Sequence, residues 1–135
     1  MKSRLVLFNL SLITLTVILF SAFSAGNDPW NIPDKYKKMK NPVKSTADNV
    51  KVGKGIWDKQ CKSCHGTAGK GDGVKAKGLK TSCGDMSSAT FHAQSDGEIY
   101  YQSIIGRNEM PNFEKKVPDE TDRWSLINFI RTLKK

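Results

Sequence analysis

The stretch Cys61-Lys62-Ser63-Cys64-His65 decides how the rest of this 135-residue sequence is interpreted. Its cysteines enclose two residues, so on a helix their thiols lie about one turn apart and can add to the two vinyl groups on one edge of a porphyrin. The adjacent histidine can then place its Nε2 under the iron as the proximal ligand. The pattern predicts one covalently bound haem c, attached through Cys61 and Cys64 and ligated by His65.

Two other uses of these cysteines have to be weighed. A thioredoxin-like C-x-x-C motif needs a βαβ context, and no strand is recognisable before Cys61. A structural zinc site is a permissible alternative, with the ligands Cys61, Cys64, His65 and Cys83. Against zinc, no knuckle or hairpin turn surrounds the motif. Outside a zinc site, Cys83 is interpreted as a small buried hydrophobic residue or as the site of an intermolecular disulfide.

A glycine-rich loop follows the motif. Its glycines are Gly66, Gly69, Gly71, Gly73 and Gly78. No strand leads into the loop, and it contains neither a GK[ST] nor a G-x-G-x-x-G pattern, so a phosphate-binding loop is excluded. We interpret the glycines as allowing the backbone to approach a flat macrocycle closely. A carbonyl of this loop is expected to accept the Nδ1–H of His65 and so to fix its tautomer.

An electron-transfer haem usually needs a second axial ligand, and the candidates are Met39, Met86, Met110 and His92. Met110 is favoured because it lies with Pro111 in an irregular segment. Proline fixes its own φ and favours an extended conformation for the residue before it, which stiffens the segment. Met86 is interpreted as a core residue. His92 is interpreted as a surface or loop residue, with a bis-histidine haem as the alternative. Thioether ligation would raise the reduction potential relative to a bis-histidine site.

Three stretches have the periodicity of helices, and no strand is convincing. The first covers residues 47–61, the second begins at a capping box formed by Ser95 and Glu98 and ends at Gly106, and the third follows Pro118. The apolar positions of the third are Trp124, Leu126, Ile127, Phe129, Ile130 and Leu133. These helices are separated by long loops, which leave too little side-chain volume for a conventional core. We therefore predict an all-α domain whose centre is filled by the haem.

The N-terminal part of the chain differs in composition from the rest. Residues 1–25 begin with Lys2 and Arg4, continue as an uncharged apolar run and end in small residues, which is typical of an export signal. A retained anchor is the alternative, because the run nearly reaches the length that crosses a bilayer. Residues 26–45, rich in proline and lysine, are predicted to form an irregular arm that packs its aromatic rings on the domain or is disordered near its start. Residues 46–135 then form the domain.

The chain is basic, with 22 lysines and arginines against 13 aspartates and glutamates and a formal charge of +9. Removal of the signal, which holds two of the basic residues, leaves +7. Eight lysines surround the motif and are called the basic rim below: Lys51, Lys54, Lys59, Lys62, Lys70, Lys75, Lys77 and Lys80. The rim is interpreted as a docking face for an acidic redox partner, with a merely solvated surface as the alternative. Nucleic acid is disfavoured as a partner, because the chain has a predicted export signal and lacks a basic groove interleaved with aromatic residues. Lysines of the arm, or the N-terminal segment, would allow membrane association.

Over roughly residues 46–134 these features together resemble the class I monohaem cytochromes c. Gly53 and Trp57 precede the motif as the small residue and the aromatic residue of that family's first helix do. Leu126 and Phe129 match the pair in its last helix that packs across the first. The strings CHGTAGKGDG and GRNEMPNF match the bacterial branch of the family.

The resemblance implies the all-α class I cytochrome c fold, His65 and Met110 as axial ligands, and a largely buried haem with one exposed edge. Cys83 and the N-terminal arm depart from the family pattern. The function expected is that of a periplasmic one-electron carrier, not an enzyme, working between a quinol-oxidising complex and a terminal oxidase or periplasmic reductase. The alternatives are a fixed haem subunit of a membrane respiratory complex, and a five-coordinate haem peroxidase or gas sensor that uses His92.

Overall fold

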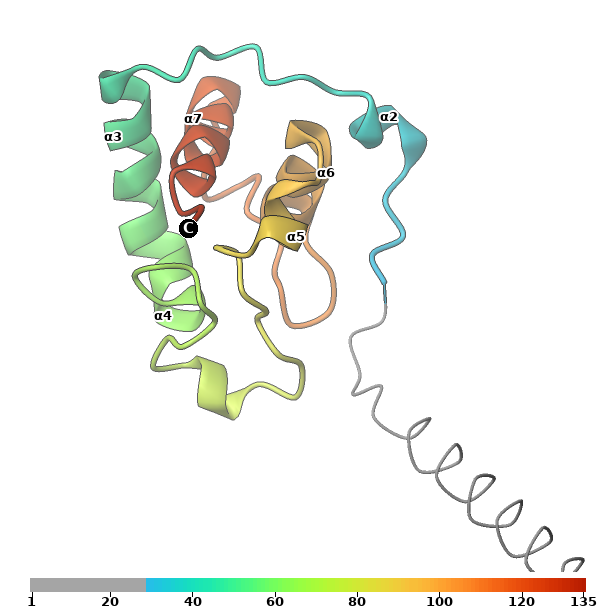
Figure 1. Cartoon of the computed structure of the whole chain (residues 1–135), viewed down its shortest axis with the longest axis vertical. Helices are drawn as coiled ribbons and strands as arrows, with labels where there is room; N and C mark the ends of the chain where they lie inside the picture. Colours follow the sequence, from blue (N-terminus) through green and yellow to red (C-terminus); the bar gives the residue numbers. More distant parts are fainter. Residues whose placement is uncertain (1–28) are drawn as a thin grey trace, which may run out of the picture.

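The computed structural model describes residues 29–135, so the signal or anchor predicted for residues 1–25 lies outside the described residues. In chain order the helical elements are α2 (Asp34–Lys37), α3 (Ala47–Ile56), η1 (Trp57–Cys61), α4 (Lys62–His65), η2 (Ala76–Gly78), α5 (Ala89–His92), α6 (Asp96–Tyr100), η3 (Tyr101–Ile105) and α7 (Glu120–Arg131). The only β-type pairing within residues 29–135 is an isolated bridge between Arg107 and Met110. The all-α prediction is confirmed (Figure 1).

The first helical stretch is longer than predicted, because α3, η1 and α4 follow one another without a break. It begins where the Thr46 hydroxyl accepts a hydrogen bond from the amide of Asn49, at 3.3 Å. Its middle is a single π-helical turn, in which the amide of Lys62 donates to the carbonyl of Trp57, five residues back. It ends at Gly66, whose φ of +78° suits a glycine. The whole C-x-x-C-H motif is therefore helical.

The second helical stretch consists of α6 and the π-helical turn η3, and it begins with the predicted capping box. The Ser95 hydroxyl accepts from the amide of Glu98 at 3.2 Å, and the Glu98 carboxylate accepts from the amide of Ser95 at 2.7 Å. The stretch ends, as predicted, at Gly106, where φ is +70° and the amide donates to the carbonyl of Tyr101.

The third helix, α7, is the centre of the molecule, with every residue from Trp124 to Ile130 buried. Its most extensive helix contact is with α3, and the two lie side by side in Figure 1. At their crossing a Cβ on Gly53 would lie 2.6 Å from the carbonyl carbon of Ser125, so only glycine permits this approach. The packing of the last helix across the first, which the family resemblance implies, is confirmed. The ring of Phe129 packs on that of Trp57, with centroids 5.7 Å apart.

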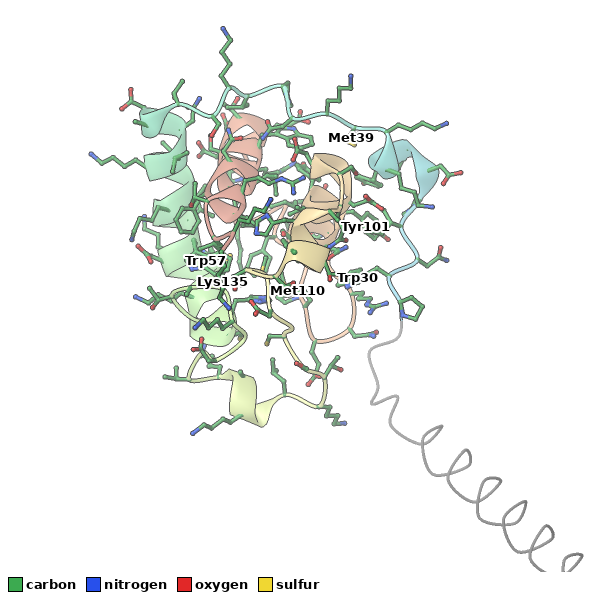
Figure 2. All side chains as sticks on the ribbon, in the orientation of Figure 1. Trp30, Met39, Trp57, Tyr101, Met110 and Lys135 are labelled. Atoms are coloured by element: carbon green, nitrogen blue, oxygen red, sulfur yellow. The ribbon has the colours of Figure 1, made fainter. Side chains whose placement is uncertain are left out.

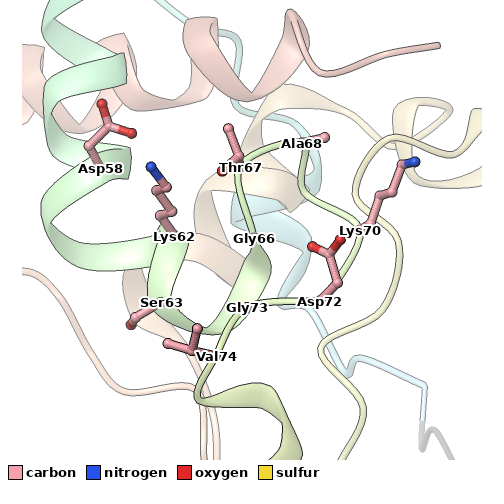
Figure 3. Close-up of a pocket in the computed structure, with 10 residues that line it drawn as sticks. All are labelled: Asp58, Lys62, Ser63, Gly66, Thr67, Ala68, Lys70, Asp72, Gly73 and Val74. Carbon is pink, nitrogen blue, oxygen red and sulfur yellow. The ribbon is translucent and has the colours of Figure 1, made fainter.

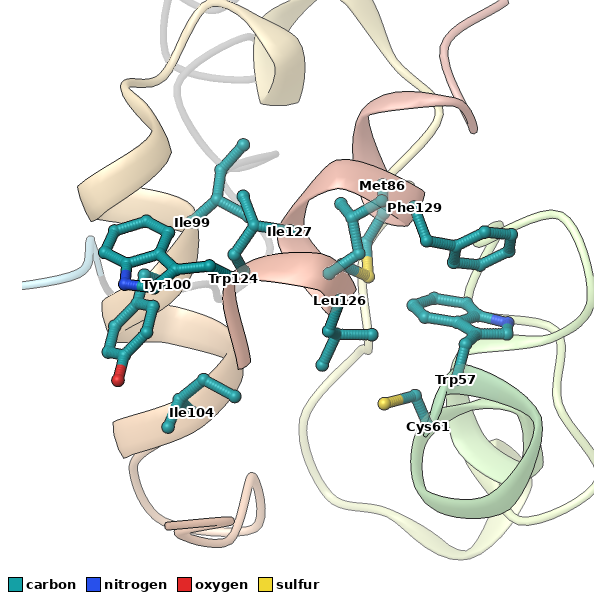
Figure 4. Packing of buried hydrophobic residues seen from close by; sticks show 11 residues of the cluster. Trp57, Cys61, Met86, Ile99, Tyr100, Ile104, Trp124, Leu126, Ile127 and Phe129 are labelled. Carbon is teal, nitrogen blue, oxygen red and sulfur yellow. The ribbon is translucent and has the colours of Figure 1, made fainter. Parts of the chain in front are cut away.

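The described residues form a contiguous hydrophobic core, shown in Figure 4. Its buried members are Trp57, Cys61, Met86, Ile99, Tyr100, Ile104, Trp124, Leu126, Ile127, Phe129 and Ile130. The prediction of too little side-chain volume was therefore wrong in part. It counted only the three helices, whereas Tyr36, Met39 and Val43 of the arm also pack against this core.

The N-terminal arm is an ordered part of this assembly from residue 29 onward. Its one-turn helix α2 was not predicted, but the packing of its aromatic rings on the domain was: the Tyr36 ring lies 4.7 Å from that of Tyr101. Polar side chains tie the arm to α7, since the Asn41 amide donates to the Asn128 side chain at 2.9 Å. Asn128 in turn donates to the carbonyl of Val43 at 3.0 Å. Among residues 29–135, no helix is long and apolar enough to cross a membrane.

Candidate haem site

The three motif side chains lie at the C-terminal end of the first helical stretch. Cys61 ends η1 and is 6% exposed, while Cys64 and His65 lie in α4 and are half-buried. Both thiols are free. Burial, with the nearby Cys64 as a second cause, raises the pKa of the Cys61 thiol from 9.0 to about 12. Cys61 is therefore a neutral sulfur in apolar surroundings, which suit a thioether better than a thiolate.

The glycine-rich loop folds back over the end of the motif helix. The amide of Gly71 donates to the carbonyl of His65 at 2.9 Å, and that of Gly73 donates to the carbonyl of Cys64 at 3.0 Å. These bonds satisfy carbonyls that a helix end leaves without partners. A Cβ on Gly73 would lie 2.6 Å from Cys64 carbonyl atoms. Gly73 thus permits a close approach to the chain's own backbone, which is a different contact from the approach to a macrocycle predicted for the glycines of this loop.

Trp57 packs against the end of the motif helix. Its side chain is fully buried, and its indole Nε1–H donates to the carbonyl of Gly66 at 3.2 Å. Its ring centroid lies 5.9 Å from that of His65, with the planes tilted by 43°. One side chain therefore contacts the core, the end of the motif helix and the candidate iron ligand together.

The imidazole of His65 has a buried nitrogen, Nδ1, without a hydrogen-bond partner. The expectation that a loop carbonyl accepts from this nitrogen was wrong; the carbonyls of Gly66 and Gly69 accept instead from the Trp57 indole and from the amide of Met86. Burial lowers the pKa of His65, so the ring is neutral at physiological pH, as a metal ligand must be. A neutral, half-buried imidazole beside two free thiols is a donor set that fits a covalently attached haem.

Met110 lies at the end of a tight turn. Its amide donates to the carbonyl of Arg107 at 2.8 Å, and the intervening Asn108 has a φ of +50°. Three residues on, Phe113 is buried, and its amide donates to the carbonyl of Ile104 at 2.8 Å, which anchors the segment to η3. Met110 itself is half-buried. We call residues 107–110 the methionine turn.

The other candidate distal ligands are placed elsewhere. Met86 is 7% exposed and belongs to the core, as predicted for it. Met39, in the arm, packs close to Gly97 of α6. His92 lies at the end of α5, where its carbonyl accepts from the Arg131 guanidinium at 2.9 Å. The residue is half-buried, and its Nε2 is buried without a hydrogen-bond partner.

The zinc alternative is not supported by the geometry. Residues 29–135 contain no group of three or more His, Cys, Asp or Glu side chains that could hold a metal ion, so the four candidate zinc ligands are not gathered in one site. Cys83 is a half-buried free thiol, which is less buried than its interpretation as a core residue required. Burial, and to a smaller extent the proximity of Cys64 and Glu109, raises its pKa.

Two residues of the methionine turn, Glu109 and Arg107, make contacts that the sequence did not indicate. The carboxylate of Glu109 accepts hydrogen bonds from the amides of Lys80 and Thr81, at 3.1 and 2.9 Å, and these bonds lower its pKa. Arg107 donates to the carbonyl of Pro29 in the arm at 2.9 Å. No sequence signal marks either partner, because the segments involved lie far apart along the chain. Figure 2 labels Met110 and the arm residue Trp30.

The surface around the motif is charged. Every lysine of the basic rim is exposed. A surface hollow of about 590 Å³ lies beside the motif helix. Figure 3 shows the residues that line it. Its lining includes Asp58, Lys62, Lys70 and Asp72, but not Cys61, Cys64, His65 or Met110. The hollow is therefore a feature of the charged exterior, distinct from the candidate haem ligands.

Comparison with known proteins gives one family and one fold. A family model described as cytochrome C oxidase, cbb3-type, subunit III matches residues 48–130. No curated protein matches the chain. Among solved structures, a chain of the Kuenenia stuttgartiensis reducing HAO-like protein complex superposes with a TM-score of 0.61 at 24% identity. The match covers 84% of this chain and 54% of that one, so this protein spans about half of its structural neighbour, and at that identity the likeness shows the fold alone.

The matched residues include the motif, all of the first helical stretch except its first residue, the methionine turn and nearly all of α7. The family model thus covers more than half of the chain and the whole candidate site. The protein therefore belongs to the family described as cytochrome c oxidase, cbb3-type, subunit III, and is a c-type cytochrome domain that binds haem and takes part in electron transfer.

Proposed function

We propose that this protein is a periplasmic one-electron carrier. In the proposed site Cys61 and Cys64 hold the haem through thioethers, His65 is the proximal ligand and Met110 the distal ligand. The observation that carries the proposal is the helical C-x-x-C-H motif, with both thiols free and a half-buried, neutral imidazole beside them. When bound, a haem iron supplies one-electron chemistry by cycling between the ferric and ferrous states.

The residues around the site favour a carrier because they keep it rigid. Trp57 and the loop amides fix the end of the motif helix, and the hydrogen bonds of the methionine turn fix the segment of the other candidate ligand, Met110. A rigid pair of axial ligands changes its geometry little between oxidation states, which keeps the reorganisation accompanying electron transfer small. No substrate needs to reach the metal in such a site.

The proposed partners are redox proteins with acidic docking surfaces: a quinol-oxidising complex on one side, and a terminal oxidase or periplasmic reductase on the other. Support comes from the exposed lysines of the basic rim, which surround the motif. Charge complementarity of this kind raises association rates more than it raises affinity, which suits brief docking.

A second candidate function is that of a fixed haem subunit in a membrane respiratory complex. The description of the matching family, a subunit of a cbb3-type oxidase, favours it. The two candidates differ in where the full chain is found. A free carrier leaves the cells with the periplasmic fraction, whereas a fixed subunit stays with salt-washed membranes.

The site is tested by absorption spectra of the purified full-length protein and of a Met110→Ala variant. We expect the spectrum of a covalent c-type haem, with a weak far-red thioether-to-iron charge-transfer band that is lost in Met110→Ala together with a lowered reduction potential. Met39→Leu is the matched control and should retain both. An unchanged band and potential in Met110→Ala would contradict the distal assignment. Rapid carbon monoxide binding by the unmodified ferrous protein would instead indicate an open, five-coordinate site.

A further inference from the structure

Within the described part of the chain, few backbone hydrogen bonds hold the methionine turn. A backbone hydrogen bond from the amide of Met110 to the carbonyl of Arg107 closes the turn, which passes through the left-handed conformation of Asn108. A turn of this kind, with exposed Asn108 and Glu109 at its tip, has alternative conformations close in energy unless other contacts exclude them. Two side chains of the turn make such contacts.

The first contact joins the turn to the returning end of the motif loop. The two carboxylate oxygens of Glu109 each accept one backbone amide, from Lys80 at 3.1 Å and from Thr81 at 2.9 Å. Hydrogen bonds to an ionised acceptor are stronger than those between neutral groups. The residue next to Met110 is therefore bound to a segment almost thirty positions earlier in the chain.

The second contact joins the turn to the N-terminal arm. The Arg107 guanidinium donates to the carbonyl of Pro29 at 2.9 Å and lies 4.1 Å from the centroid of the Trp30 ring. Trp30 in turn meets the Tyr101 ring edge-on, with centroids 6.4 Å apart. The arm, whose inner part is tied to α7, thus reaches the turn through a cation–π contact and a hydrogen bond.

We infer that Glu109 and Arg107 are positioning residues, which hold the methionine turn between the segment of Lys80 and Thr81 and the N-terminal arm. In this way they keep the thioether of Met110 in place against competing ligands. The inference rests on the proposed function, in which Met110 is the distal ligand. Each contact shifts the population of the turn away from conformations in which it has swung out and the iron is open to another ligand.

The test is the affinity of the ferric full-length protein for added imidazole, which must displace the distal ligand. Glu109→Gln keeps the size of the side chain but loses the charge and one acceptor oxygen, so we expect about fivefold tighter imidazole binding and a weaker far-red band. Glu114→Gln is the matched control. It removes the same charge from the same segment, where the carboxylate bonds only its near neighbour Asn112 in the described contacts, and it should leave both readouts unchanged.

A second variant tests the arm without altering the turn. Trp30→Ala removes the ring under Arg107, and we expect it to raise imidazole affinity by a similar factor. If both Glu109→Gln and Trp30→Ala bind imidazole as the unmodified protein does, or if Glu114→Gln shows the same increase, the inference is overturned. Met110→Ala separates this failure from that of the proposed function: loss of its far-red band upholds the ligand assignment whatever Glu109 does.

Discussion

Cys61 and Cys64 belong to one motif but lie in different surroundings. Cys61 is packed into the core with Trp57, whereas Cys64 is half-buried at the surface end of α4. Burial in the core disfavours a charged sulfur at position 61 and raises the pKa of the thiol. A thioether is uncharged at every pH, so attachment to a haem removes the conflict between this burial and ionisation of the thiol.

Single replacements of the motif cysteines give the most direct test at this scale. In Cys61→Ala and in Cys64→Ala, one vinyl group of the haem stays unsaturated and conjugated with the ring. We therefore expect the reduced absorption band of each variant, measured as the pyridine complex, to move to longer wavelength. Cys83→Ala is the control and should leave the band in place. A shift in Cys83→Ala, or none in the other two, would contradict the attachment through Cys61 and Cys64.

Individual residues differ in how far the sequence could indicate their role. The spacing of the motif and the packing expected for Met86 are local properties, and both could be stated in advance. The role of Glu109 could not, because its partners are backbone amides, and any residue except proline at positions 80 and 81 would present them. The lack of a partner for His65 Nδ1 could not be predicted either, since it depends on the direction in which each loop carbonyl points.

Among the helices, the crossing of α3 and α7 determines how the motif is held against the core. The crossing is close because Gly53 has no side chain at the point where the backbone of Ser125 passes. The same helix carries a second glycine, Gly55, and a Cβ there would meet nothing within 4 Å. The two glycines thus form an internal comparison between a position that is tightly packed and one that is open.

Gly53→Ala is expected to destabilise the protein by about 2–3 kcal/mol, because its methyl group must push the two helices apart. Gly55→Ala should instead stabilise it by up to about 1 kcal/mol, since alanine is the better helix former at an open position. Denaturant unfolding of the two variants, followed by circular dichroism, measures both changes. Equal effects of the two replacements would show that the crossing does not depend on Gly53.

The helices themselves were predictable, and their surroundings were not. Capping at Ser95 and termination at Gly106 are consequences of local hydrogen bonding, and both were confirmed. The π-helical turn at the end of α3 was missed because it adds one residue to a turn without changing the apolar pattern. The burial of Ser125 and Asn128 in α7 was missed because the helix is enclosed by α3 and by the arm, whose packing sites the sequence does not specify.

In the whole molecule, the arm and the domain are not independent. The predicted boundary at residue 46 divides the chain by composition, but side chains on both sides of it share one core. Asn41 bonds both the carbonyl of Trp124 and the side chain of Asn128, so an early segment supplies partners for buried polar groups of the last helix. The arm therefore has a structural role in addition to joining the domain to the N-terminal segment.

The distribution of charge over the molecule predicts how it meets other redox species. Lys62 stands within the motif, whereas Lys44 precedes the start of the same helical stretch, so helix geometry separates the two by more than about 20 Å. This is over twice the screening length of about 8 Å at physiological salt. In Figure 1 the segment leading into α3 lies at the opposite end of the helix from α4. Charge reversal at these positions should therefore have separable effects.

We expect Lys62→Glu to slow oxidation of the ferrous protein by anionic hexacyanoferrate about threefold at low salt, because it removes attraction beside the motif that is proposed to hold the haem. Lys44→Glu, which makes the same change of net charge, should slow it much less. A cationic hexaammine complex should show the opposite sign with Lys62→Glu, and both differences should fade as salt is raised. Stopped-flow spectroscopy measures these rates. Equal slowing by the two variants would mean that net charge alone, and not the basic rim, governs the encounter.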